Sequence, residues 1–212
     1  MPGGPSSAWL HSIDATYELV EVPEVREKYP VLAQKVAATI TACEEALRDY
    51  GWHHCALSFN GGKDCTVLAH ILTAVLRRLN GCESHQSVPT IESLYVACSQ
   101  PFTEVEQFIE YAASEETGYH LILHTTKGDL KTALTEYKEG EKGKDITAIF
   151  IGVRRDDPQG STIHVRSKCD PSWPPIMRIH PLLDWEYEDV WAFLRCPHLR
   201  VGATSSHVPS TA

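Results

Sequence analysis

The residues with the clearest chemical potential lie in one short stretch, residues 57–65, which reads LSFNGGKDC. Gly61 and Gly62 tolerate positive φ angles and carry no side chain, so the main chain there can approach an anion closely. Lys63 adds a cation, and Asp64 adds a carboxylate that could ligate Mg²⁺ or orient the loop. A helix that begins directly after such a loop supplies unpaired N–H groups and the positive end of its dipole. The stretch therefore predicts a phosphate cradle.

Other interpretations of the same stretch are weaker. Neither GxxxxGK[ST] nor GxGxxG occurs in it, so two common nucleotide loops are excluded. A turn that merely joins a strand to a helix would not need a glycine pair, a lysine and an aspartate together. Asp64 could still act only as a helix cap. Cys65 is interpreted as a small packing residue at a crowded position, and not as a nucleophile.

The elements that position this loop follow from the hydrophobic pattern. Strands and helices alternate, which predicts an α/β fold: a three-layer parallel sheet flanked by helices. In such sheets ligands bind beyond the carboxyl ends of the strands, where residues 60–65 would lie. The stretch 153–175 has no periodicity, and a loop of this length is typical of a functional segment. The predicted strands are 53–59, 91–97, 119–124, 146–151 and 176–179, and the predicted helices are 32–50, 66–79, 103–117, 129–138 and 185–195.

The composition narrows the location and the partners of the protein. The chain has 212 residues, 42% of them hydrophobic, which predicts one folded domain. A net charge of −9 argues against nucleic acid as a partner. No apolar run approaches the ~20 residues that span a bilayer, so we expect no membrane partner. Seven cysteines without a CxxC pair predict reduced thiols and a cytoplasmic location.

Three segments together resemble a known family. The stretch SFNGGKDCTVL at 58–68 is similar to the loop of FAD synthases of the animal and fungal type, a PAPS reductase-like branch of the ATP pyrophosphatases. Asn60 and Cys65 stand where the SGGxDS loop of those pyrophosphatases has serines. The segments IGVRRDDP at 151–158 and WPPIMRIHPLLDWEYEDVWAFLR at 173–195 agree as well. The resemblance covers about residues 30–195 and implies an adenine nucleotide α-hydrolase-like (PP-loop) fold.

This resemblance implies an activity. Members of the family transfer AMP from MgATP to the 5′-phosphate of FMN, giving FAD and pyrophosphate, so the expected ligands are ATP, FMN and Mg²⁺. The FMN phosphate is the nucleophile, and the protein supplies position and charge neutralisation. We expect a monomer. By position, the catalytic residues are Asn60, Asp64, Asp157 and Arg178, with Mg²⁺ at Asp64 and Asp157. The residues expected to bind the nucleotides are Ser58, Phe59, Gly61, Gly62, Lys63, Tyr95, Val96, Gly152, Arg154, Arg155, Trp173, Asp184 and Trp185.

Structural roles remain open for several of these residues. The arginines and aspartates of 154–157 could form only a surface salt-bridge cluster, and Asp156 stands where the family usually has threonine. Arg178 could instead pair with Asp184. Tyr95 and Val96 could be core residues rather than an adenine wall, and core packing is the favoured interpretation of Trp191.

The ends of the chain depart from the central pattern. Residues 1–30 are expected to form an N-terminal arm with at most one short helix, and residues 31–195 the adenylyltransferase domain. Residues 196–212, CPHLRVGATSSHVPSTA, do not follow the family pattern and are predicted to be disordered. Two other functions stay open. One is an enzyme like PAPS reductase or sulfate adenylyltransferase, although the ECGxH-like motif of the reductases is missing; the other is a non-catalytic nucleotide-binding remnant.

Overall fold

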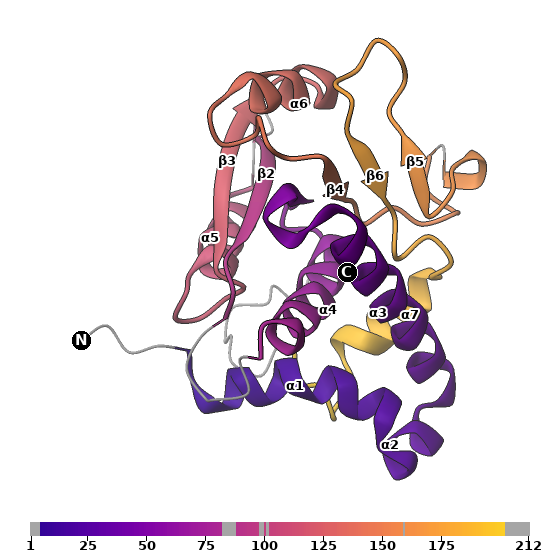
Figure 1. Cartoon of the computed structure of the whole chain (residues 1–212). Coiled ribbons are helices and arrows are strands. Elements are labelled where there is room, and N and C mark those ends of the chain that lie inside the picture. The colour runs from indigo at the N-terminus through magenta and orange to yellow at the C-terminus, as the bar shows by residue number, and fades with distance from the viewer. Residues whose placement is uncertain (1–4, 82–87, 98–99, 101, 159, 202–212) are drawn as a thin grey trace.

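The computed structural model describes residues 5–81, 88–97, 100, 102–158 and 160–201 (Figure 1). Its helices are α1 (Ser7–Glu21), α2 (Pro23–Lys28), α3 (Pro30–Tyr50), α4 (Lys63–Leu79), α5 (Thr103–Ala113), α6 (Leu130–Glu139) and α7 (Tyr187–Leu194), with short 3-10 turns η1 (Trp52–His54) and η2 (Gly160–Thr162). Its strands are β1 (Cys55–Ser58), β2 (Ile91–Ala97), β3 (Leu121–Lys127), β4 (Ala148–Phe150), β5 (Arg166–Lys168) and β6 (Met177–Ile179).

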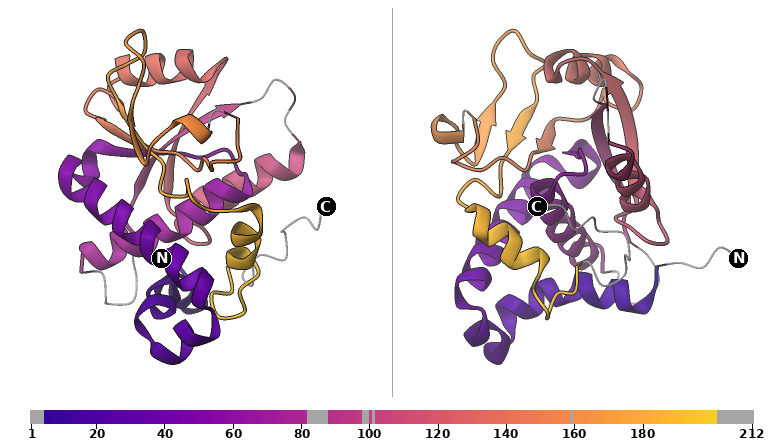
Figure 2. Two further views of the ribbon diagram at one scale, coloured as in Figure 1. Left: turned by 90° about the vertical axis from the view of Figure 1, so that its right-hand side faces the viewer. Right: turned by 180° about the vertical axis from the view of Figure 1, so that it is seen from behind.

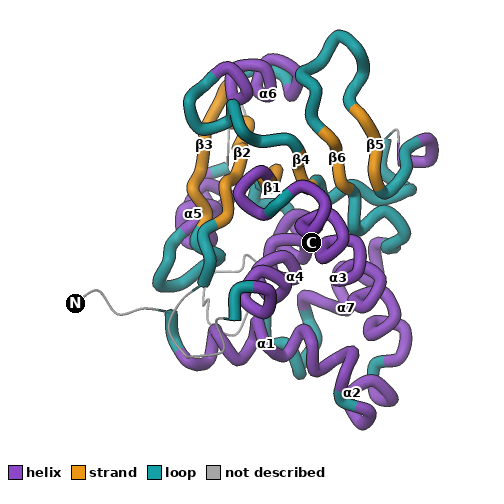
Figure 3. Tube along the Cα trace, in the orientation of Figure 1, coloured by secondary structure: helices purple, strands orange, loops and turns teal. Residues whose placement is uncertain are grey.

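The strands form one six-stranded sheet in the order β3-β2-β1-β4-β6-β5. All neighbours run parallel except β5 and β6, which are antiparallel. Figure 3 shows the strands in one row, with long loops around β5 and β6. The predicted α/β fold is confirmed. The sequence did not predict β5, because a three-residue strand is too short to show alternation within the stretch 153–175.

The two faces of the sheet are covered unequally. Helix α6 packs Ala133, Leu134 and Tyr137 against Ala56 and Ile149 on one face. The other face packs against a larger layer that includes α3, α4, α5 and α7. Figures 1 and 2 show α1 and α2 on the far side of this larger layer from the sheet.

Helix α4 lies at the centre of the molecule, and every residue from Cys65 to Arg77 is buried. A helix that is buried on all sides must pack against other elements around its whole circumference. The sheet and α3 cover one side, and α1 covers another through a paired contact: Arg77 Nε and Nη2 lie 3.0 and 2.9 Å from the two carboxylate oxygens of Asp14. The phosphate loop therefore opens onto the end of a helix that is held along its length.

The prediction of an N-terminal arm with at most one short helix is wrong. Helix α1 has 15 residues, begins with a Ser6 side chain that accepts the Trp9 N–H, and buries Trp9, Ile13 and Leu19. The prolines at 23 and 30 misled the prediction. Each lies at the start of a helix, where its missing N–H costs no intrahelical bond.

The prediction of disorder from residue 196 onward is wrong for the first part of that segment. Cys196, Leu199 and Val201 are buried, and the Leu199 carbonyl accepts the Ser12 hydroxyl at 2.5 Å. His198 Nε2 lies 2.9 Å from a Glu18 carboxylate oxygen. The unpredicted α1 supplies the surface on which these residues pack. Residues 202–212 lie outside the described residues, and the domain boundaries themselves stay a prediction.

Candidate phosphate-binding site

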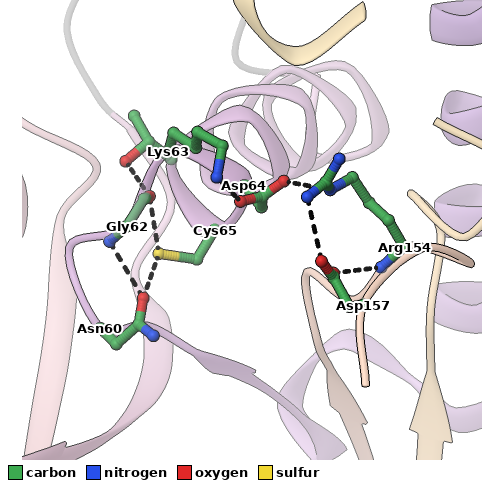
Figure 4. A network of polar contacts seen from close by, with 8 residues as sticks. Asn60, Gly62, Lys63, Asp64, Cys65, Arg154 and Asp157 are labelled. Atoms are coloured by element: carbon green, nitrogen blue, oxygen red, sulfur yellow. Dashed lines mark hydrogen bonds and ion pairs between the residues drawn. The ribbon is translucent and has the colours of Figure 1, made fainter. Parts of the chain in front are cut away.

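The loop between β1 and α4 has the shape of an anion cradle. Gly61 has φ 73°, and a Cβ there would lie 2.9 Å from Ile109 Cγ1 of α5. Asn60 Oδ1 accepts hydrogen bonds from the Gly62 N–H and the Cys65 thiol, both at 3.0 Å (Figure 4). The predicted catalytic residue Asn60 thus uses its side-chain oxygen to brace the loop.

The start of α4 leaves N–H groups for a ligand. Its first intrahelical bond runs from the Thr66 N–H to the Gly62 carbonyl, so the N–H groups of Lys63, Asp64 and Cys65 precede the helical ladder. Gly62 is the N-cap and carries no side chain to satisfy them. Together with the helix dipole, these groups favour a bound phosphate.

Cys65 behaves as a packing residue, as the sequence predicted. Its thiol is buried and donates to Asn60 Oδ1 and to the Gly62 carbonyl. Burial raises the pKa of the Cys65 thiol to about 11, so the nucleophilic thiolate is rare at neutral pH.

A second loop, which follows β4, closes over the first turn of α4. Gly152 permits the approach, because a Cβ there would lie 3.0 Å from the Cys65 main-chain nitrogen. Arg154 Nε lies 2.8 Å from Asp64 Oδ1, and Arg154 Nη2 lies 3.0 Å from Asp157 Oδ1. Asp157 Oδ2 also accepts the Arg154 main-chain N–H at 2.8 Å. One guanidinium therefore joins the two loops (Figure 4).

The neighbouring Arg155 has a different environment. Half of its side chain is exposed, and its Nε lies 2.5 Å from Oδ1 of Asp184, whose side chain is even more exposed. Arg155 and Asp184 thus form an exposed ion pair, which the sequence did not predict because it offered Arg178 as the partner of Asp184. Arg154, with a side chain only 9% exposed, does not belong to such a surface cluster.

Arg178 and Trp173 lie apart from Arg154 and its two carboxylate partners. Arg178 is in register with Ile149, and its Nη2 donates to the Lys168 carbonyl at 3.0 Å rather than to Asp184. Trp173 packs against the core cluster on the α6 face. Among the described residues, no ion pair or hydrogen bond connects either of them to Asp64, Arg154 or Asp157.

Several residues predicted to contact a nucleotide are core residues. Trp185 is 3% exposed, donates its Nε1–H to Thr39 Oγ1 at 2.9 Å and packs against Phe193, so its ring offers no free face for stacking. Phe59 is fully buried. Tyr95 is 8% exposed, which agrees with the core interpretation of its side chain. Val96 is partly buried against the second cluster, and Ser58 ends β1 in register with Leu94.

A large groove lies beside the loop, and no pattern in the sequence predicted it. It has a volume of about 1340 Å³ and runs from Gly61 and Lys63 along aromatic side chains of several helices. Tyr187 and Trp191, four residues apart on α7, contribute rings in an edge-to-face arrangement with centroids 6.2 Å apart. The half-exposed Tyr187 ring lies 5.4 Å from Lys63 Nζ, at the point where groove and loop meet.

The carboxylates predicted to hold Mg²⁺ do not fit that role in this arrangement. Asp64 Oδ2 lies 3.0 Å from Lys63 Nζ, and the other oxygens of Asp64 and Asp157 all face nitrogen atoms of Arg154. Among the described residues, no cluster of three or more His, Cys, Asp or Glu side chains could hold a metal ion. Likewise, no described helix has the length and apolar character needed to cross a membrane.

A mostly parallel α/β sheet with a glycine loop at the N-terminus of a buried helix is typical of nucleotide-binding α/β domains. Within this class, residues 54–202 match the phosphoadenosine phosphosulfate reductase domain, and the chain belongs to this family.

Relatives with known names fit this assignment. The chain is 33% identical over 191 residues to a probable FAD synthase of Caenorhabditis elegans. The aligned region covers 90% of this chain and 35% of the relative. It is 31% identical over 168 residues to a probable FAD synthase of Schizosaccharomyces pombe, which covers 79% of this chain and 62% of the relative. The chain thus spans only part of these relatives.

Solved structures show the same fold. The structure of Candida glabrata FMN adenylyltransferase in complex with ATP superposes with a TM-score of 0.74 at 22% sequence identity. The match covers 88% of this chain and 63% of that one.

Proposed function

We propose that this domain is an FMN adenylyltransferase, which transfers AMP from MgATP to the 5′-phosphate of FMN and releases FAD and pyrophosphate. The observation that carries the proposal is the Asn60–Cys65 loop at the start of α4, joined by Arg154 to the loop after β4. The curated relatives named FAD synthase support it. So do structures of the Candida glabrata enzyme with FMN and AMPCPP, and with FAD and pyrophosphate.

The reaction needs no nucleophile from the protein. An oxygen of the FMN phosphate forms a bond to the α-phosphorus of ATP, and the bond from that phosphorus to the bridging oxygen of pyrophosphate breaks. The chain contributes charge and position: the first-turn N–H groups of α4 and the cations Lys63 and Arg154 lie where phosphate oxygens would be held. Mg²⁺ enters with ATP as part of the substrate, and no step is assigned to a resident metal.

An assay on this chain tests the proposal directly. MgATP and FMN are added, and FAD is followed by its separation from FMN while pyrophosphate is measured enzymatically. We expect one FAD for each pyrophosphate. Pyrophosphate without FAD, or neither product despite ATP binding, would contradict the proposal, and the second result would favour the non-catalytic remnant.

The alternative of a sulfate-metabolism enzyme has less support. Cys196 lies in RCPHLR and is 4% exposed, so its thiol is not presented to a substrate. The same assay with adenylylated sulfate and a thiol reductant should give no sulfite, and sulfite formation would revive this alternative.

A cytoplasmic monomer is the proposed state of the protein. The described cysteines Cys43, Cys55, Cys65, Cys169 and Cys196 are free thiols, which supports a reducing compartment. Light scattering after gel filtration tests the monomer, and fluorescence microscopy of a tagged chain tests the location.

A further inference from the structure

We propose that Asp64 and Asp157 are positioning residues for the Arg154 guanidinium, so that the fixed cation of the site is an arginine rather than a carboxylate-bound Mg²⁺. The inference rests on the proposed function only in that ATP is the ligand. It differs from the sequence-based prediction, in which the two carboxylates are the metal ligands.

Asp64 and Asp157 form a clamp around the Arg154 guanidinium. Asp64 lies in the first turn of α4 and Asp157 in the loop after β4, and the two carboxylates hold different nitrogens of Arg154. Asp157 in addition fixes the start of its own loop, because Oδ2 accepts the Arg154 main-chain N–H. Nη2 donates a hydrogen bond to Asp157 Oδ1, whereas Nε makes an ion pair with Asp64 Oδ1 that lacks hydrogen-bond geometry. The guanidinium is thus held between two carboxylates from different segments.

The second argument is burial. The side chains of Arg154 and Asp64 are 9% and 18% exposed, so their attraction is screened less than that of a surface pair. Loss of one partner would leave the remaining charges of this cluster less fully compensated. The contrast with the half-exposed Arg155–Asp184 pair, one residue along the chain, shows that only Arg154 is enclosed.

The third argument concerns the oxygens that a metal would need. Mg²⁺ prefers near-octahedral oxygen coordination at about 2.0–2.1 Å. Here every carboxylate oxygen of Asp64 and Asp157 faces a nitrogen of Arg154 or Lys63. A metal at either carboxylate would have to share it with a cation that already contacts it. The two carboxylates and two cations instead cancel one another, so the cluster adds no net negative charge beside an incoming phosphate.

One nitrogen of the Arg154 guanidinium is left to bind a ligand. Its contacts use Nε and Nη2, and Nη1 makes no ion pair or hydrogen bond with any residue that the structure describes. Arg154 lies against the first turn of α4, where the N–H groups of Lys63, Asp64 and Cys65 have no hydrogen-bond partner in the part of the chain that the structure describes. Arg154 Nη1 and these N–H groups are therefore the donors we assign to the triphosphate of ATP.

The test is ATP binding by calorimetry, measured with Mg²⁺ and again with EDTA, on wild type, Asp64→Asn, Asp157→Asn and Arg154→Lys. Positioning predicts that each variant weakens ATP binding by about tenfold under both conditions, since the arginine acts on phosphate whether or not metal is present. The Mg²⁺ concentration that gives half-maximal MgATP binding should not move. Asp49→Asn is the matched control, because it removes a carboxylate from an exposed arginine pair, Asp49–Arg166, outside the site.

A double-mutant cycle gives a readout that a purely structural role would not move. If Asp157 acts through Arg154, Asp157→Asn should have little further effect on ATP affinity in the Arg154→Lys background. Thermal unfolding of each variant establishes that it is folded, and Asp157→Asn carries the test if Asp64→Asn does not fold.

Three results would overturn the inference: variant effects that vanish in EDTA, a tenfold shift of the Mg²⁺ midpoint, or additive effects in the cycle. A wild-type chain that binds no ATP would overturn it together with the proposed function. A chain that binds ATP with the predicted pattern but makes no FAD would leave the inference standing and contradict only the proposed function.

Discussion

The phosphate loop and the aromatic groove meet at Gly61 and Lys63, but they are built in opposite ways. At the loop, polar side chains from two segments pair with one another at 2.8–3.0 Å. In the groove, rings from α1, α5 and α7 face an open space of about 1340 Å³. The loop is thus organised by its own polar contacts, whereas the groove is lined mainly by apolar side chains of separate helices. The comparison teaches that the two regions should respond to different perturbations.

Lowering the pH should reduce the free energy of unfolding through a histidine beside the groove, and this is the largest effect we expect. His70 lies beneath Trp9 and Tyr119, which line the groove, and its Nε2–H donates to the Ser12 carbonyl at 3.1 Å. Burial lowers the pKa of His70 to about 4 from an unfolded value of about 6.5. Between these two pH values the His70 imidazole is protonated in the unfolded chain but stays neutral in the folded chain. Above pH 6.5 the neutral His70 imidazole does not reduce the free energy of unfolding. About 3 kcal/mol of that free energy is lost as the pH falls to 4.

Urea unfolding at several pH values measures this loss, with His70→Gln as the variant that cannot titrate. The free energy of unfolding of the wild type should fall more steeply than that of the variant between pH 6.5 and 4.5. Parallel curves would show that His70 does not carry the effect.

Gly61→Val should abolish the cradle, with at least a hundredfold loss of ATP affinity, or about 2.7 kcal/mol. A branched side chain is strained at φ 73° and would collide with Ile109. The control is Gly81→Ala, which also has a positive φ but has no neighbour within 4 Å of the new Cβ. Calorimetry with ATP checks both, and an unchanged affinity in a folded Gly61→Val protein would mean that the loop is only a turn.

Asp64→Ala should lower FAD formation at least tenfold, or about 1.4 kcal/mol in the barrier. The variant removes both the anchor of Arg154 and the partner of Lys63. Steady-state turnover with MgATP and FMN measures it, and thermal unfolding shows whether the fold is kept. Full activity in a folded variant would remove Asp64 from the site.

Tyr187→Ala should have the smallest effect, a roughly threefold loss of ATP affinity, because a half-exposed cation–π contact contributes about 0.5–1 kcal/mol. Its ring lies 5.4 Å from Lys63 Nζ and is the side chain that joins groove to loop. Tyr187→Phe keeps the ring and should bind ATP like wild type. Equal losses in both variants would point to the hydroxyl and not to the ring face.

The same contrast explains what could be read from the sequence. The cradle was predictable, because its glycines, lysine and aspartate are adjacent in the chain and follow a strand. The clamp was only half predictable: both motifs were visible, but no local signal shows that Arg154 reaches Asp64. The groove could not be predicted, since its rings come from elements that meet only in the folded chain. Trp185 was misassigned because its place in a motif does not reveal which way its ring faces.

The hydrogen bond between Ser12 and Leu199 spans 187 residues and has a consequence for how the protein is made. At about 5–20 residues per second, Ser12 is synthesised roughly ten to forty seconds before its partner Leu199. Trp9, Ile13 and Leu19, all buried in the finished protein, lack part of their cover during that interval. Helices α2, α3 and α4 can cover α1 early in translation, whereas its contact with Leu199 forms only when synthesis is nearly complete. Chains arrested before residue 199 should be cut by protease within α1, whereas complete chains should be protected there.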